Sequence, residues 1–154
     1  METIKNTLNE FLVDIYDTLL KREEMALASG GFADLSVKEM HLIDAVRRAN
    51  ELRDNSSRAV AKILQITAGS LTTAAAALEK KGYITRYKDL KDKRIVRLCT
   101  TEKGDMAFAH HKKFHEQLVD SVTAILSVGE AEVFAKGIAK VTDFFKGCNS
   151  KERD

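Results

Sequence analysis

The segment YITRYKDLKDKRIVRLC, residues 83–99, differs in pattern from the sequence around it and sets the fold class of the chain. Two short runs rich in β-branched and aromatic residues, YITRY and RIVRLC, flank a loop that carries charges of both signs. Such runs are typical of strands, and a polar connection between them is typical of a hairpin. The segment therefore predicts a small two-stranded hairpin in a chain that otherwise has helical periodicity.

The loop of this hairpin contains two acidic residues with a predicted structural role. Asp89 and Asp92 can accept hydrogen bonds from nearby backbone amides or pair with a neighbouring arginine. Either interaction stiffens the turn and holds Arg94 outward.

Basic residues are concentrated in and beside the hairpin. Residues 80–97 contain eight Lys or Arg against two Asp, a net charge of +6, whereas the whole chain carries only +2. Residues 1–24 have the opposite sign, with a net charge of −3. A surface that binds a polyanion needs such a local excess, because its affinity comes from the phosphates that it neutralises.

The first 50 residues predict two helices. Apolar residues recur at helical spacing to about residue 28, and Ser29-Gly30-Gly31 ends this helix. A capping box formed by Ser36 and Glu39 then opens a second helix that extends to about residue 49.

Two further helices, over 57–64 and 68–81, lie directly before the hairpin, with the three residues 65–67 between them. Two helices joined by a three-residue turn match the spacing of a helix-turn-helix. A helix-turn-helix followed at once by a basic hairpin has the order of a winged helix. The sequence therefore predicts a mainly α (α+β) fold, a winged helix-turn-helix with a small β-hairpin wing.

The C-terminal third predicts two more helices. One runs from about residue 101 to about residue 125, and a second capping box, Ser127 with Glu130, opens the last one. The apolar stripes of the N- and C-terminal helices are larger than one small winged helix can cover. We therefore expect these helices to dimerise the protein.

The chain of 154 residues is long enough for one domain with a substantial core. Within a single domain over 1–154, we expect 35–100 to form the winged helix-turn-helix, and 1–28 and 101–147 to form the helical dimerisation part. No apolar run has the length of a membrane span, and the N-terminus lacks the pattern of a signal peptide. These features predict a cytoplasmic protein that does not associate with a membrane.

The sequence lacks the motifs of an enzyme. It has no GxSxG elbow, Walker loop or HExxH, and its eight glycines are scattered among turns and helix ends. Its two cysteines lie far apart and form no metal-ligand pair. We expect a non-enzymatic DNA-binding protein without a bound cofactor, either a sequence-specific regulator or an architectural protein that binds DNA of any sequence.

Four motifs in this order resemble the multiple-antibiotic-resistance-regulator (MarR) family of bacterial transcription factors. They are GSLTT (69–73), LEKKGYITR (78–86), DLKDKR (89–94) and TEKG (101–104). The resemblance implies a winged helix-turn-helix repressor that binds a pseudo-palindromic DNA operator as a homodimer.

Within that family the chain is most similar to the FabT subgroup, whose members repress fatty-acid synthesis. SVKEMH (36–41), HKKFH (111–115) and the run from Leu71 to Ile84 carry this likeness. It implies control of fatty-acid synthesis genes, with a long acyl chain on acyl carrier protein as the effector.

The helix over 68–81 is then the recognition helix, whose N-terminal turns face base edges. Its predicted DNA contacts are hydroxyl side chains, which can reach bases or phosphates, while the apolar Leu71, Ala75 and Leu78 are predicted to be core. In the wing, three basic side chains are predicted to contact phosphates and Arg94 is predicted to enter the minor groove. The predicted DNA-binding residues are Ser70, Thr72, Thr73, Arg86, Lys88, Lys91 and Arg94.

Three of the four histidines predict a second site. His111 and His115 are four residues apart beside the apolar stripe of their helix, and His41 on the second helix can face them. With Phe108 they form the predicted effector pocket. The alternative is a zinc-responsive regulator, because two imidazoles one turn apart can share a metal ion, with Glu24 as a possible oxygen ligand.

Overall fold

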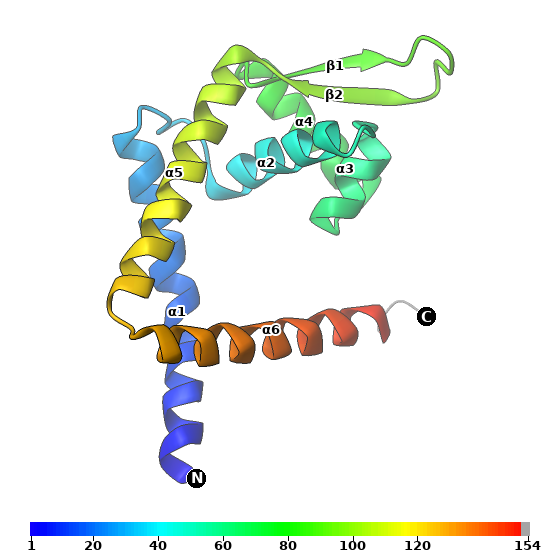
Figure 1. The fold of residues 1–154 in the computed structure, drawn as a ribbon. Helices are drawn as coiled ribbons and strands as arrows, with labels where there is room; N and C mark the ends of the chain where they lie inside the picture. Colours follow the sequence, from blue (N-terminus) through cyan, green and yellow to red (C-terminus); the bar gives the residue numbers. More distant parts are fainter. Residues whose placement is uncertain (152–154) are drawn as a thin grey trace. The chain divides into compact units, whose positions relative to one another are not determined.

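The computed structural model describes residues 1–151, and the side chains of residues 1–147. It confirms a mainly helical fold with one two-stranded antiparallel hairpin (Figure 1). Along the chain the elements are α1 (Glu2–Ser29), α2 (Val37–Glu51), α3 (Ser57–Leu64), α4 (Ala68–Lys80), β1 (Ile84–Lys88), β2 (Val96–Thr100), α5 (Glu102–Ala124) and α6 (Val128–Lys151).

The chain divides into two compact units. The first covers residues 1–114 and contains α1 to β2 with the first half of α5. The second begins at residue 115 and contains the rest of α5 together with α6. None of the helices among the described residues combines the length and the apolar character that a membrane span requires.

The helix boundaries follow the capping residues of the sequence. The predicted capping box at α2 is present: the Ser36 side chain accepts from the Glu39 amide at 3.2 Å, and the Glu39 carboxylate accepts from the Ser36 amide at 2.9 Å. Thr67 caps α4 by accepting from the amide of Ser70, and Gly82, with a φ of 80°, follows the end of that helix. The predicted capping box at the start of α6 is also present.

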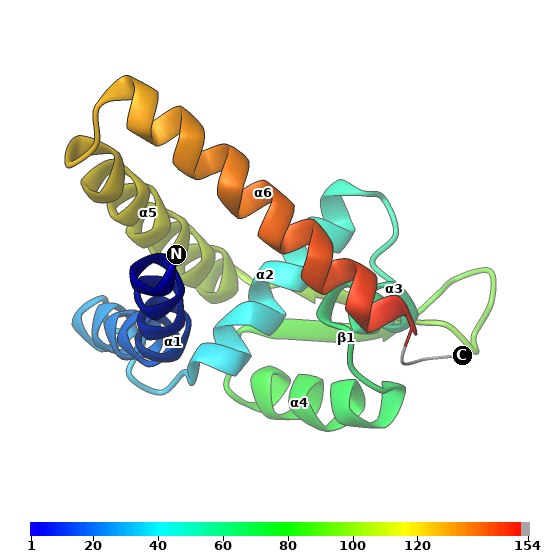
Figure 2. The same ribbon diagram turned by 90° about the horizontal axis from the view of Figure 1, so that it is seen from below.

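The hairpin is regular from end to end. Its register pairs Ile84 with Thr100 at one end and Lys88 with Val96 at the other. At the tip, the amide of Asp89 donates to the carbonyl of Ile95 at 2.9 Å and closes the loop. Figure 2 shows α4 running alongside β1, so α4 and the hairpin belong to one packed body.

The core of the first unit joins the helix-turn-helix to the hairpin. Leu71, Ala75 and Leu78 on the inner face of α4 are at most 2% exposed, which confirms their predicted place in the core. Full burial of one large apolar side chain stabilises the fold by about 1.5–3 kcal/mol. Other fully buried side chains of this core are Met40, Ile43, Val46, Val60, Tyr83, Ile84 and Leu98.

Tyr83 connects the start of the hairpin to the start of α5. Its carbonyl accepts from the Thr101 amide at 3.0 Å, and its hydroxyl donates to Asp34 at 2.6 Å. The ammonium of Lys103 lies 4.0 Å from the centre of the ring. Gly104 packs against the carbonyl of Tyr83 so closely that a Cβ at this position would overlap the backbone.

Gly104→Ala is expected to lower the free energy of unfolding by about 1–3 kcal/mol, because backbone atoms must move to admit the methyl group. Gly129→Ala is the control, since a Cβ at this helical position meets open space and alanine favours helix by at most about 1 kcal/mol. Chemical denaturation of both variants measures the difference. Equal unfolding free energies would contradict the close packing of α5 against Tyr83.

Candidate nucleic-acid interface

The N-terminal turns of α4 present three hydroxyl side chains to solvent. Ser70, Thr72 and Thr73 are all exposed, whereas Leu71, Ala75 and Leu78 of the same helix are buried. The hydroxyl of Thr72 donates to the Ala68 carbonyl at 2.9 Å, and that of Thr73 donates to the Gly69 carbonyl at 3.3 Å. Each threonine oxygen therefore retains lone pairs that can accept from a base or from water.

The Thr67 cap also orders the first of these hydroxyls. Thr67 donates its hydroxyl proton to Ser70 Oγ at 2.9 Å and accepts from the Ser70 amide at 3.2 Å. The serine side chain is thus held in place before any ligand arrives, which lowers the entropy lost when it makes a contact.

The acidic residues of the hairpin loop have their predicted structural role. Asp89 Oδ1 accepts from the amides of Lys91 and Asp92 at 2.9 and 3.0 Å. Asp92 in turn accepts from the amide of Arg94 and from its guanidinium, at 2.9–3.0 Å. The Arg94 side chain is nevertheless 91% exposed, so it is oriented by Asp92 and still open to a ligand.

These hydrogen bonds keep the loop carboxylates ionised. Backbone amides, first that of Asp92, and the Arg97 guanidinium lower the pKa of Asp89 to about 2. The hydrogen bond from Arg94 likewise lowers the pKa of Asp92. The loop therefore has the same ionised carboxylates throughout the neutral range.

The predicted phosphate contacts fall into two groups. Lys88 and Lys91, together with the neighbouring Lys93, are exposed and make no ion pair with any residue that the structure describes. Arg86 is different, because its guanidinium donates twice to Glu79 Oε2, at 2.6 and 2.8 Å. This pair fastens β1 to the end of α4, and the role of Arg86 as a phosphate contact stays a prediction.

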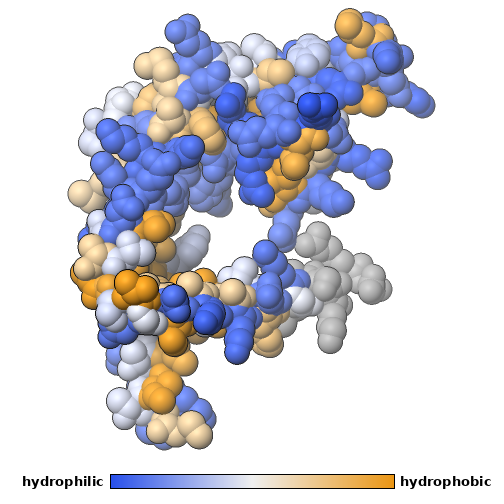
Figure 3. Space-filling model, in the orientation of Figure 1, coloured by the Kyte–Doolittle hydropathy of each residue, from blue (hydrophilic) through white to orange (hydrophobic). Residues whose placement is uncertain are grey.

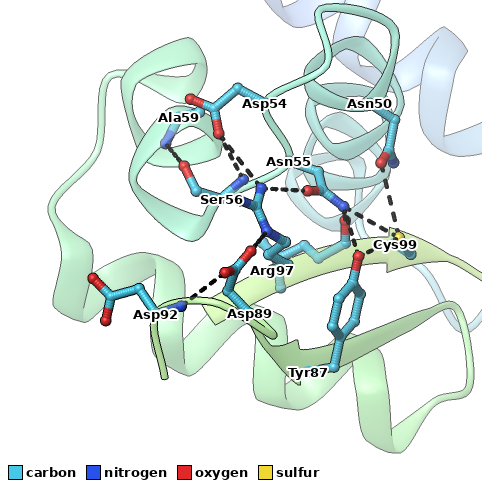
Figure 4. A network of polar contacts seen from close by, with 11 residues as sticks. Asn50, Asp54, Asn55, Ser56, Ala59, Tyr87, Asp89, Asp92, Arg97 and Cys99 are labelled. Carbon is cyan, nitrogen blue, oxygen red and sulfur yellow. Dashed lines mark hydrogen bonds and ion pairs between the residues drawn. The ribbon is translucent and has the colours of Figure 1, made fainter. Parts of the chain in front are cut away.

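Arg97 is a functional candidate that the sequence analysis did not single out. Its guanidinium, on β2, donates to Asn55 Oδ1 at 3.0 Å and to the carboxylate of Asp89 (Figure 4). The signal in the sequence was an arginine inside an otherwise apolar strand run, IVRLC, because a partly buried charge in a strand needs partners.

The predicted second site brings two histidines together around one carboxylate. His41 of α2 and His111 of α5 place their Nε2 atoms 3.4 and 3.2 Å from Glu23 Oε1. Asp44 lies on the other side of His111, with its Oδ1 3.8 Å from Nδ1. Burial raises the pKa of Glu23, but the histidines outweigh it and the net shift is downward. Burial lowers the pKa of His111, but Asp44 and Glu23 shift it upward overall.

The carboxylate at this cluster corrects one predicted ligand. Glu24 was the expected oxygen ligand, yet it is exposed, and Glu23 takes the inward position. The reason is helical geometry. Glu23 lies on the inner face of α1 with Leu20 and Leu27, whereas Glu24, the next residue, lies about 100° around the helix axis from Glu23.

Phe108 of the predicted pocket packs against the core of the first unit, and the Arg47 guanidinium lies 5.3 Å from the centre of its ring. His115 lies one turn beyond His111 on α5 and is the first residue of the second unit. His110, which was not predicted to have a role, is hydrogen-bonded to the carbonyl of Ala26 at 2.8 Å.

Comparison with known families and curated proteins identifies the same region. The model of the MarR family matches residues 38–96, which run from α2 to β2. The uncharacterized HTH-type transcriptional regulator YpoP of Bacillus subtilis (strain 168) is 38% identical over 50 residues. That match spans 32% of this chain and 36% of YpoP, about a third of each.

Solved structures extend the similarity to almost the entire chain. The crystal structure of Streptococcus pneumoniae FabT in complex with DNA is 35% identical, with a TM-score of 0.85 over 94% of this chain and 99% of FabT. The S. aureus MepR–DNA complex has the same fold, with a TM-score of 0.71 over 86% of this chain and 95% of MepR, at 19% identity. By its identity to FabT over nearly the whole of both chains, this protein belongs to the MarR family of winged helix-turn-helix, DNA-binding transcriptional regulators.

Proposed function

We propose that the protein is a sequence-specific repressor that binds a pseudo-palindromic operator as a homodimer and controls fatty-acid synthesis genes. The observation that carries its DNA-binding mode is the combination of the exposed hydroxyls of α4 with the exposed, Asp92-oriented Arg94 in one packed unit. The exposed hydroxyls of Ser70, Thr72 and Thr73 meet base edges in the major groove, and Arg94 enters the adjacent minor groove. Lys88 and Lys91 contact the phosphates between them.

The exposed apolar surface of the terminal helices supports the homodimer. On α1, the side chains of Ile4, Leu8 and Phe11 repeat at helical spacing and are 45–63% exposed. On α6, Phe134, Ile138, Val141 and Phe145 also repeat at helical spacing and are 43–52% exposed. Figure 3 shows orange side chains along both helices, in contrast to the largely blue hairpin. Faces of this length on two helices are larger than the scattered apolar groups of a monomer surface.

A two-fold dimer determines the form of the operator. Two copies of α4 enter successive major grooves, so the half-sites are about 34 Å apart, one turn of the duplex. Sedimentation of the protein alone at micromolar concentration tests this step. A monomer under those conditions would exclude the dimeric arrangement.

Selection of duplexes from a random library tests the function itself. The expected result is one inverted-repeat sequence, bound at least about a thousandfold more tightly than unrelated DNA at the same salt concentration. Equal affinity for all duplexes, with a steep dependence on salt, would instead indicate an architectural DNA-binding protein.

The effector is tested on the selected duplex. The resemblance to the fatty-acid-synthesis repressors leads us to propose long-chain acyl-acyl carrier protein as the ligand. Its addition is expected to change operator affinity, whereas acyl carrier protein without an acyl chain is expected to have no effect. An unchanged affinity with both forms would remove the fatty-acid part of the proposal and leave the repressor part intact.

Arg94→Ala is expected to weaken binding to the selected duplex by about tenfold or more, because a minor-groove guanidinium is lost. The fold should not change, since Arg94 is 91% exposed and its hydrogen bonds within the described part of the chain go to Asp92. Arg22→Ala removes the same charge from an exposed position of α1 and serves as the control. Fluorescence anisotropy at fixed salt measures both affinities, and equal affinities would contradict the assignment of the wing.

A second candidate function, a response to zinc, is favoured by the geometry of the histidine cluster. Glu23 Oε1 lies 3.4 Å from His41 Nε2 and 3.2 Å from His111 Nε2. Two ligands of a tetrahedral zinc ion, each about 2.1 Å from the metal, are themselves about 3.4 Å apart. Each histidine nitrogen thus lies from the Glu23 oxygen at the separation of two ligands of one zinc ion, and these side chains supply nitrogen and oxygen ligands.

Glu23→Gln and Glu24→Gln separate the two functions. If zinc is the effector, the wild-type protein binds zinc and its affinity for DNA changes. Glu23→Gln is expected to lose zinc affinity by about tenfold or more. Glu24→Gln is expected to behave as the wild type. Competition with a chelating dye measures zinc affinity. Zinc binding that is equal in all three proteins, or that does not alter DNA affinity, would exclude this function.

A further inference from the structure

We propose that Arg97 is a positioning residue for DNA binding: together with Asn55 and Asp89 it fixes the hairpin against the start of α3. This group of three residues is called the hairpin anchor below. The proposal rests on the proposed roles of Arg94 and α4 and adds residues that position them without contacting DNA themselves.

The guanidinium of Arg97 connects two parts of the chain that are far apart in sequence. It donates through Nη1 to Asn55 Oδ1 at 3.0 Å, and through Nε to Oδ2 of Asp89. Asp54 Oδ1 lies 4.0 Å away and adds a weaker attraction. Figure 4 shows the guanidinium enclosed between the loop before α3 and the hairpin, and its side chain is only 27% exposed. Its charge is therefore directed inward and offset by carboxylates.

Asn55 extends this connection to the backbone of β2. Its carbonyl accepts from the Leu98 amide at 2.9 Å, and its Nδ2 donates to the Leu98 carbonyl at 3.0 Å. Ser56, the next residue, forms an isolated antiparallel bridge with Arg97 and caps α3. The two residues before α3 thus pair with β2 almost as a third strand would.

Asp89 carries the connection to the tip of the hairpin. One of its oxygens accepts from the amides of Lys91 and Asp92, and the other accepts from Arg97. The loop amides and the Arg97 guanidinium on β2 therefore share one carboxylate. Because Asp92 orients Arg94, a continuous series of polar contacts runs from the start of α3 to the proposed minor-groove side chain.

An arginine suits this position better than a lysine. Its planar guanidinium donates in two different directions at once, here to Asn55 and to Asp89. A lysine ammonium is a point charge that can pair with Asp89 but does not reproduce the fixed fork. The anchor thus reduces the freedom of the wing before binding, and less entropy is lost when the wing meets the duplex.

Asp89→Asn tests the anchor, because the loss of a negative charge and the loss of the bond to Arg97 predict opposite changes in DNA affinity. Removing a negative charge from a DNA-binding surface strengthens binding if charge alone decides. The anchor predicts the reverse, a loss of about fivefold or more, since an Asn side chain keeps an oxygen for the loop amides but presents an amide to Arg97. Glu51→Gln, which neutralises an exposed acid at the end of α2, is the matched control and is expected to bind at least as tightly as the wild type.

Arg97→Ala and Arg97→Lys complete the series on the duplex selected above. Arg97→Ala is expected to lose about tenfold in affinity with an unchanged salt slope, because no phosphate contact is removed. The double variant with Asp89→Asn is expected to bind no worse than Arg97→Ala alone, since both remove the same contact. Should the alanine variant fail to fold, Arg97→Lys, which keeps the charge but not both bonds, is expected to show a similar though smaller loss.

Hydrogen exchange of the loop amides gives a readout without DNA. Faster exchange at residues 91 and 92 is expected in Asp89→Asn and Arg97→Ala, and wild-type exchange in Glu51→Gln. Tighter DNA binding by Asp89→Asn would overturn the anchor. A salt slope reduced by about 1 in Arg97→Ala would also overturn it, and would make Arg97 a direct phosphate contact. If the wild type selects no operator, the proposed function fails. If Arg94→Ala loses DNA affinity but Asp89→Asn does not, the anchor is refuted and the proposed function is kept.

Discussion

The burial of Tyr83 between the end of α4 and the start of α5 is the constraint on which the first unit depends. Its ring is fully buried, its hydroxyl donates to Asp34, and its two backbone groups bond to α4 and to the residue that precedes α5. Burial and the hydrogen bond to Asp34 raise the pKa of its phenol, so the hydroxyl remains a donor at any physiological pH. Because Gly104 has no side chain, the start of α5 packs directly against the Tyr83 carbonyl. The wing therefore has a fixed starting point beside the recognition helix.

The basic residues of the hairpin serve two purposes that a net charge does not distinguish. Arg86 and Arg97 are held by Glu79 and Asp89, and they connect the hairpin to α4 and to the start of α3. The exposed lysines and Arg94 remain available to phosphates. A surface built only from exposed cations binds any polyanion, whereas cations on a hairpin with a fixed position require a matching groove.

The sequence predicted the elements well because the signals for them are local. Capping boxes at Ser36 and Ser127 and the alternation of the hairpin depend on residues a few positions apart, and each prediction was confirmed. Side-chain partners across the fold were harder to predict. The sequence analysis named Glu24 and not Glu23, because the sequence alone does not show which of two adjacent residues of α1 faces the core. Arg97 was missed because its partner Asn55 lies 42 residues away.

Helix α2 is the element through which an effector can act on the DNA-binding surface. Its N-terminal half carries His41 and Asp44, which face Glu23 and His111. Its C-terminal end carries Asn50, whose Oδ1 lies 3.8 Å from Cys99 on β2, and the helix also packs against α3 and α4. A ligand in the histidine cluster shifts DNA affinity only if it binds one arrangement of α2 more tightly than another. Within the first unit, α2 contacts the histidine cluster, α4 and the hairpin, so a ligand that distinguishes two arrangements of α2 would also distinguish two arrangements of its contacts with these elements.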